Sequence, residues 1–231
     1  MIPIYVNVFN RLTMTRTLCA QLANLPNADV VIIDNNSTWI PLLDWYSNEC
    51  PHEVIRLREN LGKHAPWLSG VVGSNPADVY GVTDCDLDLT GVPLDLLDVL
   101  SQPLDTYTKV GIGLRIHDLP DWQSEVVKWE SQFWQRPVTV LDRLYFRSLI
   151  DTTLCLYRRD TPDKTAMTVV GIPTLRSGGD YIARHAPWYL DCLNLDEENA
   201  NYFTTASGTA TWKPKGQALS AGYSGKPVRF R

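Results

Sequence analysis

The stretch Asp78-Val79-Tyr80-Gly81-Val82-Thr83-Asp84-Cys85-Asp86-Leu87-Asp88 joins a short run of β-prone residues to three carboxylates spaced two residues apart. In an extended chain this spacing places the three on one face. Carboxylates held close together repel one another, and a common reason for holding them is a divalent cation such as Mg²⁺ or Mn²⁺, which takes oxygen ligands. Asp also ends many strands simply by hydrogen-bonding its own backbone. The stretch therefore predicts a strand end that is either an ordinary turn or a site for a metal ion and phosphate.

Apolar strands alternate with helical segments in the residues before this stretch. The pattern predicts strands at residues 2–8, 30–33, 54–57 and 79–83, and helices after Thr13, at 41–46 and at 66–72, with Thr13 as a helix cap. This alternation predicts an α/β fold with a mostly parallel central sheet and helices on both faces. In such sheets the ligand lies beyond the carboxyl ends of the strands.

Polar residues follow each of the four predicted strands. They are residues 7–11, Asp34-Asn35-Asn36-Ser37, Glu59-Asn60-Leu61-Gly62-Lys63 and the three carboxylates of the opening stretch. Because the carboxyl ends of parallel strands share one edge of a sheet, we expect these residues to converge on one polar crevice.

The second half of the chain has a different pattern. It predicts helices at residues 92–100, 124–135 and 196–205, strands at 109–116 and 152–157, and a loop at 171–179. No repeat or linker divides the sequence, so we expect a single domain over residues 1–231. Residues 211–231 contain five basic residues and no acidic one, which predicts a mobile, solvated tail or, alternatively, a flap that closes over a pyrophosphate.

The composition is that of a folded globular domain, since 44% of the 231 residues are hydrophobic and 20% are charged. The net charge of −5 argues against nucleic acid as a partner. Without an apolar run long enough for a membrane span or a signal peptide, we expect a cytoplasmic protein. The five cysteines are scattered and form no C-x-x-C pair, which is typical of reduced thiols.

Four short motifs, in order, carry a resemblance to a known family. They are Asn7-Val8-Phe9-Asn10-Arg11, Asp34-Asn35-Asn36-Ser37, Asn60-Leu61-Gly62 and Asp84-Cys85-Asp86. As an ordered set over residues 1–90 they resemble the GT-A glycosyltransferases, most closely the family-2-like group. The resemblance implies a GT-A fold in which residues 1–90 bind the nucleotide and residues 91–210 hold the acceptor and catalytic groups.

The resemblance also implies a nucleotide pocket. In it Asn7 and Phe9 would flank the base, Asp34 would contact uracil or ribose, and Asn60 and Lys63 would complete the pocket beside Asp84.

A divalent cation, Mn²⁺ or Mg²⁺, is implied by the same resemblance. Asp84 and Asp86 would hold it against the two phosphates of the donor. Leu87 stands where the family commonly has a further acidic residue, so the pair Asp86 and Asp88 is the alternative. His185 would complete the metal shell, or else is an ordinary core or surface histidine.

The sequence leaves several candidates for the catalytic carboxylate. The blocks at residues 151–159 and 180–189 resemble parts of bacterial and viral sugar transferases. An inverting reaction needs a carboxylate to accept the proton of the acceptor hydroxyl, and the candidates are Asp151, Asp180, which precedes a predicted helix, and Glu198. In a retaining reaction the leaving phosphate takes the proton, and Asp151 would instead steady the donor sugar.

The tryptophans allow two interpretations. Trp122, Trp129 and Trp134 have a spacing that suits packing of a helix against the core, whereas Trp188, beside His185, could stack on the apolar face of a sugar.

These features predict a metal-dependent glycosyltransferase that moves a sugar from a nucleotide donor, with UDP as the expected nucleotide, to a hydroxyl of a glycan acceptor, alone or within a multi-domain transferase. One alternative is a nucleotidyltransferase that makes sugar nucleotides, but residues 8–17 contain no glycine for a phosphate-cradling loop. The other is a non-catalytic sugar- or nucleotide-binding module, which a missing carboxylate would mark; both carboxylates are present.

Overall fold

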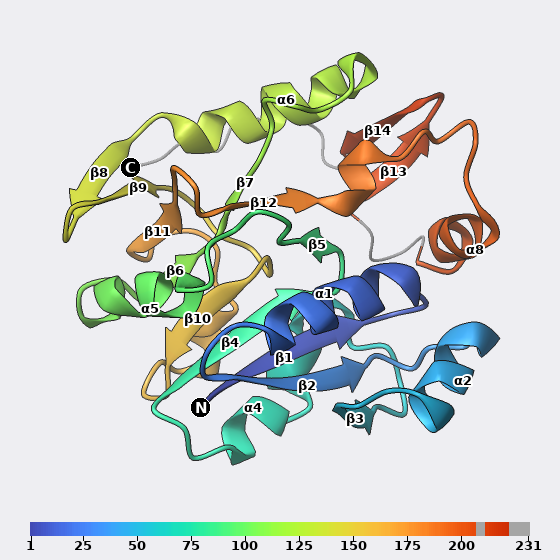
Figure 1. Cartoon of the computed structure of the whole chain (residues 1–231), viewed down its shortest axis with the longest axis horizontal. Helices are drawn as coiled ribbons and strands as arrows, with labels where there is room; N and C mark the ends of the chain where they lie inside the picture. Colours follow the sequence, from blue (N-terminus) through green and yellow to red (C-terminus); the bar gives the residue numbers. More distant parts are fainter. Residues whose placement is uncertain (207–210, 222–231) are drawn as a thin grey trace.

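The computed structural model describes residues 1–206 and 211–221. Over these residues the chain forms one α/β body around a large sheet (Figure 1). The strands of that sheet are β1 (Ile2–Val8), β2 (Ala28–Asp34), β3 (Glu53–Arg56), β4 (Val79–Asp84), β6 (Lys109–Gly111), β8 (Pro137–Val140), β9 (Arg143–Arg147), β10 (Cys155–Arg158) and β11 (Thr174–Ser177). Their spatial order is β3-β2-β1-β4-β10-β6-β11-β9-β8. The predicted α/β class is confirmed.

The N-terminal part of the sheet is parallel. Strand β1 pairs with β2 and β4, and β2 pairs with β3, all in parallel. The register sets Val8 opposite Asp34 and Asn7 opposite Asp84. Three of the sequence motifs therefore meet at one edge of the sheet, as the strand pattern predicts.

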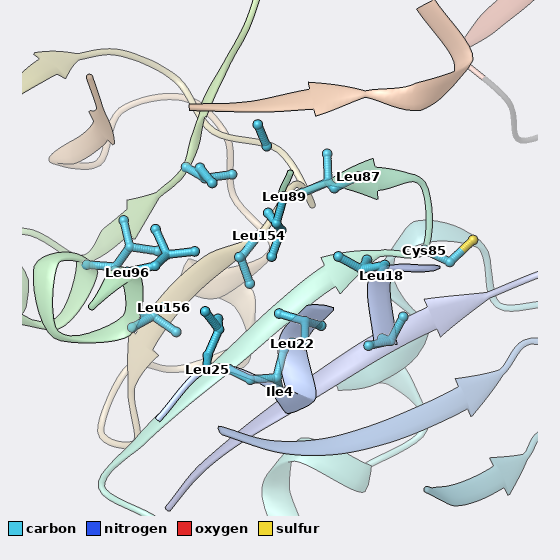
Figure 2. Close-up of a cluster of buried hydrophobic side chains, with 14 of the residues drawn as sticks. Ile4, Leu18, Leu22, Leu25, Cys85, Leu87, Leu89, Leu96, Leu154 and Leu156 are labelled. Atoms are coloured by element: carbon cyan, nitrogen blue, oxygen red, sulfur yellow. The ribbon is translucent and has the colours of Figure 1, made fainter. Parts of the chain in front are cut away.

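Helices cover both faces of this parallel part. On one face α1 (Thr13–Ala23) packs Leu18 and Leu22 against Ile4 of β1, and α2 (Ile40–Asn48) joins the same core (Figure 2). On the other face α3 (Ala65–Leu68) and α4 (Val71–Ser74) cover the alternate side chains of the strands. The single helix predicted at 66–72 is divided because Gly70 lies between the two with φ 78°, the left-handed region that favours glycine.

Beyond β4 the sheet becomes mixed. Strand β10 is antiparallel to both β4 and β6, β11 is parallel to β6, and β9 and β8 extend the edge in antiparallel fashion. A smaller sheet lies beside it, in the order β5 (Leu87–Asp88), β12 (Ile182–His185), β7 (Gly113–Leu114).

Short helices complete this half. They are α5 (Leu96–Ser101), α6 (Ser124–Glu130), which continues as the 3-10 turn Ser131–Trp134, α7 (Asp163–Ala166) and α8 (Glu197–Thr205). The helix predicted at 92–100 therefore begins later than expected. No helix among the described residues is long and apolar enough to cross a membrane.

Two predictions for the second half are wrong in detail. The strand expected at 109–116 is divided between β6 and β7, which belong to different sheets. At the division a Cβ on Gly113 would come within 2.3 Å of the Ser177 carbonyl oxygen, so the close approach requires glycine. The loop expected at 171–179 contains β11, whose four residues are all buried. Its polar residues and flanking glycines conceal the strand in the sequence.

Of the two alternatives for residues 211–231, the mobile, solvated tail does not hold for residues 211–221. Strands β13 (Trp212–Lys215) and β14 (Ala218–Ala221) form an antiparallel hairpin beside α6 (Figure 1). Leu219 is fully buried in the main core, and its backbone N–H donates to Gln123 Oε1 at 3.0 Å. The buried Leu219 side chain and this hydrogen bond therefore hold the hairpin in the fold, although its basic composition had indicated a solvated segment. The remaining basic residues, Lys226, Arg229 and Arg231, lie outside the described residues.

Candidate active site

A cleft of about 580 Å³ opens beyond the carboxyl ends of β1, β2 and β4. Of the residues predicted for the site, Asp34, Asp180 and the alternatives Asp88 and Glu198 do not line this cleft. Those that line it are Asn7, Phe9, Asn60, Lys63, Asp84, Asp86, Asp151 and His185. Residues from both halves of the sequence therefore meet in one cavity, and the role of each stays a prediction.

Two asparagines tie the strand ends to the loop after β3. Asn7 Nδ2 and Asn35 Nδ2 both donate to the Gly62 carbonyl oxygen, at 3.2 and 2.9 Å, and the Leu61 backbone N–H donates to Asn35 Oδ1 at 2.7 Å. Asn60 Oδ1 in turn accepts from the Gly62 N–H at 2.8 Å. These bonds fix the backbone of the loop at the mouth of the cleft.

Asp34 does not line the cleft. Its side chain is fully buried, and its carboxylate accepts from the Ser37 N–H and from Arg56 Nε, both at 3.2 Å. The Tyr46 hydroxyl lies 3.4 Å from the other oxygen. Asp34 therefore holds the strand end together, and its neighbour Asn35 lines the cleft in its place. Direct contact of Asp34 with a base or ribose does not fit this position.

The side chains of the carboxylate motif divide between core and cleft. Cys85 and Leu87 are buried in the main core, where Figure 2 shows them, and Cys85 also borders the cleft that Asp84 and Asp86 line. Asp88 does not line it, because its Oδ1 accepts from Gln21 Nε2 at 2.8 Å and from Thr90. Of the three carboxylates in this motif, Asp84 and Asp86 line the cleft, which is the favoured pair of the two considered.

Asp84 is held by Thr152. The Thr152 hydroxyl donates to Asp84 Oδ2 at 2.7 Å, and the Asp84 N–H donates to the Thr152 carbonyl oxygen at 3.0 Å. Burial and the neighbouring charge of Asp86 raise the pKa of Asp84 well above its usual range. Two carboxylates at one strand end thus repel each other in the absence of a cation.

His185 reaches Asp86 through strand pairing. Strands β12 and β5 place His185 opposite Leu87, and the Ala186 N–H donates to the Asp86 carbonyl oxygen at 2.8 Å. His185 Nε2 then lies 3.5 Å from Asp86 Oδ1. Burial lowers the pKa of His185, which favours the neutral imidazole that a metal requires.

The Arg11 side chain supplies a positive charge beside Asp86. Its guanidinium lies 3.2 Å from Asp86 Oδ2 and 3.6 Å from the centre of the Tyr202 ring in α8. The side chain is almost fully buried, so the ion pair is shielded from water. Arg11 stands within a sequence motif, but its contact with α8 was not predicted.

Of the three proposed catalytic carboxylates, only Asp151 lines the cleft. Lys63 Nζ lies 2.7 Å from Asp151 Oδ2, and both side chains are half-exposed. Asp180 is exposed and precedes strand β12, not a helix as expected. Glu198 caps α1, because its carboxylate accepts from the Thr13 N–H at 3.0 Å and from the Thr13 hydroxyl at 2.9 Å. The Thr13 side chain therefore does not cap the helix itself.

Several residues of the second half line the cleft without having been predicted. They include Trp129, Glu130, Phe133, Arg176 and Trp212. Glu130 and Arg176 form a buried ion pair between α6 and β11. Burial raises the pKa of the Glu130 carboxyl to about 7, against the lowering effect of Arg176. Glu130 is one of three charged residues in the partly exposed helix α6, whereas Arg176 is the charged residue of the buried strand β11. A local sequence pattern cannot pair two residues that lie so far apart in the chain.

The solved structures similar to this chain include a mannosyltransferase. The mannosyltransferase PcManGT from Pyrobaculum calidifontis, solved with GDP-Man and Mn²⁺, matches with a TM-score of 0.51 at 13% identity, over 89% of this chain and 60% of that one. GalNAc-T7, solved with UDP, GalNAc and Mn²⁺, matches with a TM-score of 0.53 at 15% identity, over 80% of this chain and 43% of that one. The fold is that of the GT-A-type glycosyltransferases.

The resemblance in fold extends across both halves of the chain, since 80% and 89% of it superpose on these two GT-A proteins. The chain spans less than two thirds of the length of either. No protein-family profile matches the sequence, and no curated protein sequence matches it.

Proposed function

We propose that this GT-A chain is a glycosyltransferase that moves a sugar from a nucleotide donor to a hydroxyl group of a glycan acceptor. The observation that carries the proposal is the meeting of Asp84, Asp86 and His185 in one cleft with the loop that Asn7 and Asn35 hold. A cluster of this kind suits a nucleoside diphosphate, whose phosphates need neutralising and whose base needs a shaped pocket. We assign the donor to residues 1–90 and the acceptor to residues 91–210.

The residues present fit a divalent cation. Asp86 Oδ1 is buried without a hydrogen-bond partner, beside the neutral imidazole of His185, and carboxylate oxygen and imidazole nitrogen suit Mn²⁺ or Mg²⁺. No three such side chains within the described ranges gather closely enough to hold a metal alone. A site of one or two carboxylates completed by substrate phosphates is the usual form for Mg²⁺.

We therefore assign the cation to Asp84 and Asp86, with His185 as a further ligand. When bound, the cation would neutralise the negative charge that develops on the leaving nucleoside diphosphate. PcManGT and GalNAc-T7, the two similar proteins, were both solved with Mn²⁺.

Asn7, Phe9, Asn60 and Lys63 form the donor pocket in this proposal. Phe9 offers an aromatic face to the base, and the loop after β3 offers backbone groups whose position the asparagines fix. Lys63 places an ammonium group within reach of the phosphates. UDP is the nucleotide we assign; GDP is the alternative, since PcManGT was solved with GDP-Man.

Asp151 is the carboxylate assigned to the reacting centre. In an inverting reaction it accepts the proton of the acceptor hydroxyl as the new C1–O bond forms. In a retaining reaction the leaving phosphate takes that proton, and Asp151 holds the donor sugar. The anomeric configuration of the product, read by NMR, distinguishes the two.

The experiment is a nucleotide-release assay with Mn²⁺ and a panel of UDP-sugars and GDP-mannose. Asp86→Asn should abolish release from the preferred donor while the thermal unfolding midpoint stays within a few degrees. Asp88→Asn is the matched control, since Asp88 belongs to the same motif but lies outside the cleft, and it should retain release. Full activity of Asp86→Asn would remove Asp86 from the metal site.

A further inference from the structure

Four of the aromatic side chains that line the cleft come from α6 with its 3-10 extension, from the 3-10 turn Ala186–Tyr189 and from the β13–β14 hairpin. They are Trp129, Phe133, Trp188 and Trp212, which we call the aromatic end. We propose that the aromatic end binds the acceptor, and that the acceptor group bound there is an uncharged sugar ring. The proposal rests on the proposed function, because it names the second substrate of the same cleft.

Three segments far apart in the sequence build the aromatic end, and one of them, the 3-10 turn Ala186–Tyr189, carries Trp188. Helix α6 and its 3-10 extension carry Trp129 and Phe133, whose ring centres are 6.0 Å apart, and the β13–β14 hairpin carries Trp212. The hairpin lies beside α6 (Figure 1), and the Leu219 N–H donates to Oε1 of Gln123, the residue that precedes α6. The aromatic end is therefore part of the packed fold.

The aromatic end is continuous with the carboxylate cluster. The Trp188 ring centre lies 4.6 Å from that of His185 and 5.9 Å from that of Trp212. A chain of ring contacts thus runs from Asp86 through His185 to the hairpin. A sugar on these rings would lie next to a donor sugar whose phosphates sit at Asp84 and Asp86, which is where an attacking hydroxyl must be.

Two unpartnered polar atoms belong to residues that line the same cleft. The Trp188 indole Nε1 and the Thr153 hydroxyl are buried without a hydrogen-bond partner, and both residues line the cleft. Buried polar groups are normally paired, so a ligand with hydroxyl groups is the partner they lack. A sugar ring has the matching chemistry, because its C–H face packs on an aromatic ring while its hydroxyl groups accept and donate at the edge.

The charges of the cleft define the class of sugar. Each lysine and arginine among its described lining residues lies beside a carboxylate: Arg11 beside Asp86, Lys63 beside Asp151 and Arg176 beside Glu130. At the aromatic end Arg176 is further engaged, since its Nε donates to the Leu149 carbonyl oxygen and its guanidinium lies 4.4 Å from the Phe133 ring centre. A carboxylate or phosphate on the ligand would have to break one of these pairs. The aromatic end therefore favours a neutral hexose or N-acetylhexosamine.

Transfer of the sugar from the donor to the acceptor hydroxyl needs no reactant other than these two substrates. The acceptor hydroxyl oxygen forms a bond to C1 of the donor sugar as the bond from C1 to the phosphate oxygen breaks. The electron pair of the broken bond leaves with the nucleoside diphosphate, and the hydroxyl proton goes to Asp151 or to the leaving phosphate.

The test measures binding of free glycosides by saturation-transfer NMR and calorimetry. The probes are the neutral methyl glycosides of glucose, galactose, mannose and N-acetylglucosamine, with methyl glucuronide and glucose 6-phosphate as charged counterparts. The variants are Trp129→Ala and Trp212→Ala, with Trp122→Ala as the matched control, because Trp122 is 38% exposed and does not line the cleft. If Trp212→Ala disturbs the hairpin, as its unfolding midpoint would show, Trp212→Leu keeps apolar bulk without the ring.

At least one neutral glycoside should bind, and its affinity should fall about tenfold or more in the Trp129 and Trp212 variants but not in Trp122→Ala. Binding of the charged probes equal to or tighter than that of the neutral ones would overturn the proposal. So would unchanged glycoside affinity in both cleft variants.

Titration of UDP and GDP with Mn²⁺ in the same preparations separates this proposal from the proposed function. Nucleotide binding without binding of any glycoside overturns the aromatic acceptor site and leaves the transferase proposal standing. Glycoside binding without nucleotide binding supports the aromatic site and contradicts the transferase. Loss of nucleotide affinity in Trp129→Ala would assign the rings to the donor and overturn the acceptor site.

Discussion

Glu130 is a carboxyl group buried in the wall of the cleft, and Arg176 is its charged partner. Burial holds its pKa at about 7 in the folded protein, above the value of 4.5 that an exposed glutamate has. The folded protein therefore keeps a proton that the unfolded chain releases. The resulting stability is fully present below about pH 4.5 and is lost as the pH rises through about 7.

This linkage predicts a pH-dependent difference between the native chain and Glu130→Gln. The free energy of unfolding of the native chain, minus that of the variant, should fall by up to about 3 kcal/mol between about pH 5 and about pH 8. Urea unfolding at the two pH values measures it. A difference that rises with pH would mean that the ion pair with Arg176 outweighs burial.

The sequence alone does not decide which of two neighbouring residues, Asp34 or Asn35, faces the cleft. Asp34 and Asn35 stand in one motif, and either could face the cleft on pattern alone. Ser37, Arg56 and Tyr46 contact Asp34 in the folded chain and turn it inward. Arg56 belongs to the next strand, so the information that decides between Asp34 and Asn35 lies outside the motif.

At the scale of single elements, helix α1 begins with a cap from a distant helix. Glu198 of α8 accepts from the backbone N–H and the hydroxyl of Thr13. A carboxylate at a helix N-terminus satisfies a free N–H and interacts favourably with the helix dipole. This contact joins α8, which carries Tyr202 over Arg11, to the parallel half of the fold.

We expect Glu198→Ala to lower the free energy of unfolding by about 0.5–2 kcal/mol through loss of this cap. Sugar transfer by the folded fraction should be retained, since Glu198 lies outside the cleft lining. Denaturant unfolding and the nucleotide-release assay on one preparation test both statements. A variant of native stability without activity would return Glu198 to the list of candidate bases.

Element prediction succeeded where the apolar spacing within a segment itself marks the strand or helix. The strands and helices of residues 1–90 follow from their own apolar periods, and the parallel order follows from their alternation. Strands β11 and β12 depend on partners far away in the chain, and β11 carries the buried Arg176. In β11 the charge of Arg176 is paired with Glu130 of α6, so a charged residue stands where the sequence pattern of a buried strand has an apolar one.

At the scale of the whole molecule, the second half completes the cleft by folding over the parallel edge. The β13–β14 hairpin contributes Trp212 to the cleft and Leu219 to the main core. The sequence placed a nucleotide site at the strand ends and left residues 211–231 open between a solvated tail and a flap. It did not predict a packed hairpin, because five basic residues dominate the composition of a segment with one anchoring leucine.

Leu219→Ala tests whether the hairpin belongs to the folded core. Because Leu219 is fully buried, the substitution should lower the free energy of unfolding by about 2–5 kcal/mol. The exposed Leu193, at 68% exposure, is the matched control, and Leu193→Ala should cost less than about 0.5 kcal/mol. Equal effects of the two substitutions would indicate that the hairpin is detached in solution.

The central claim is that one cleft binds a nucleoside diphosphate through a cation held by Asp84 and Asp86. Calorimetric titration of UDP, GDP and CDP, each with and without Mn²⁺, measures this most directly. We predict that UDP binds only with Mn²⁺, and that Asp84→Asn abolishes this binding while Asp88→Asn preserves it. Failure of every nucleoside diphosphate to bind, or binding that is indifferent to both Mn²⁺ and Asp84, would contradict the account.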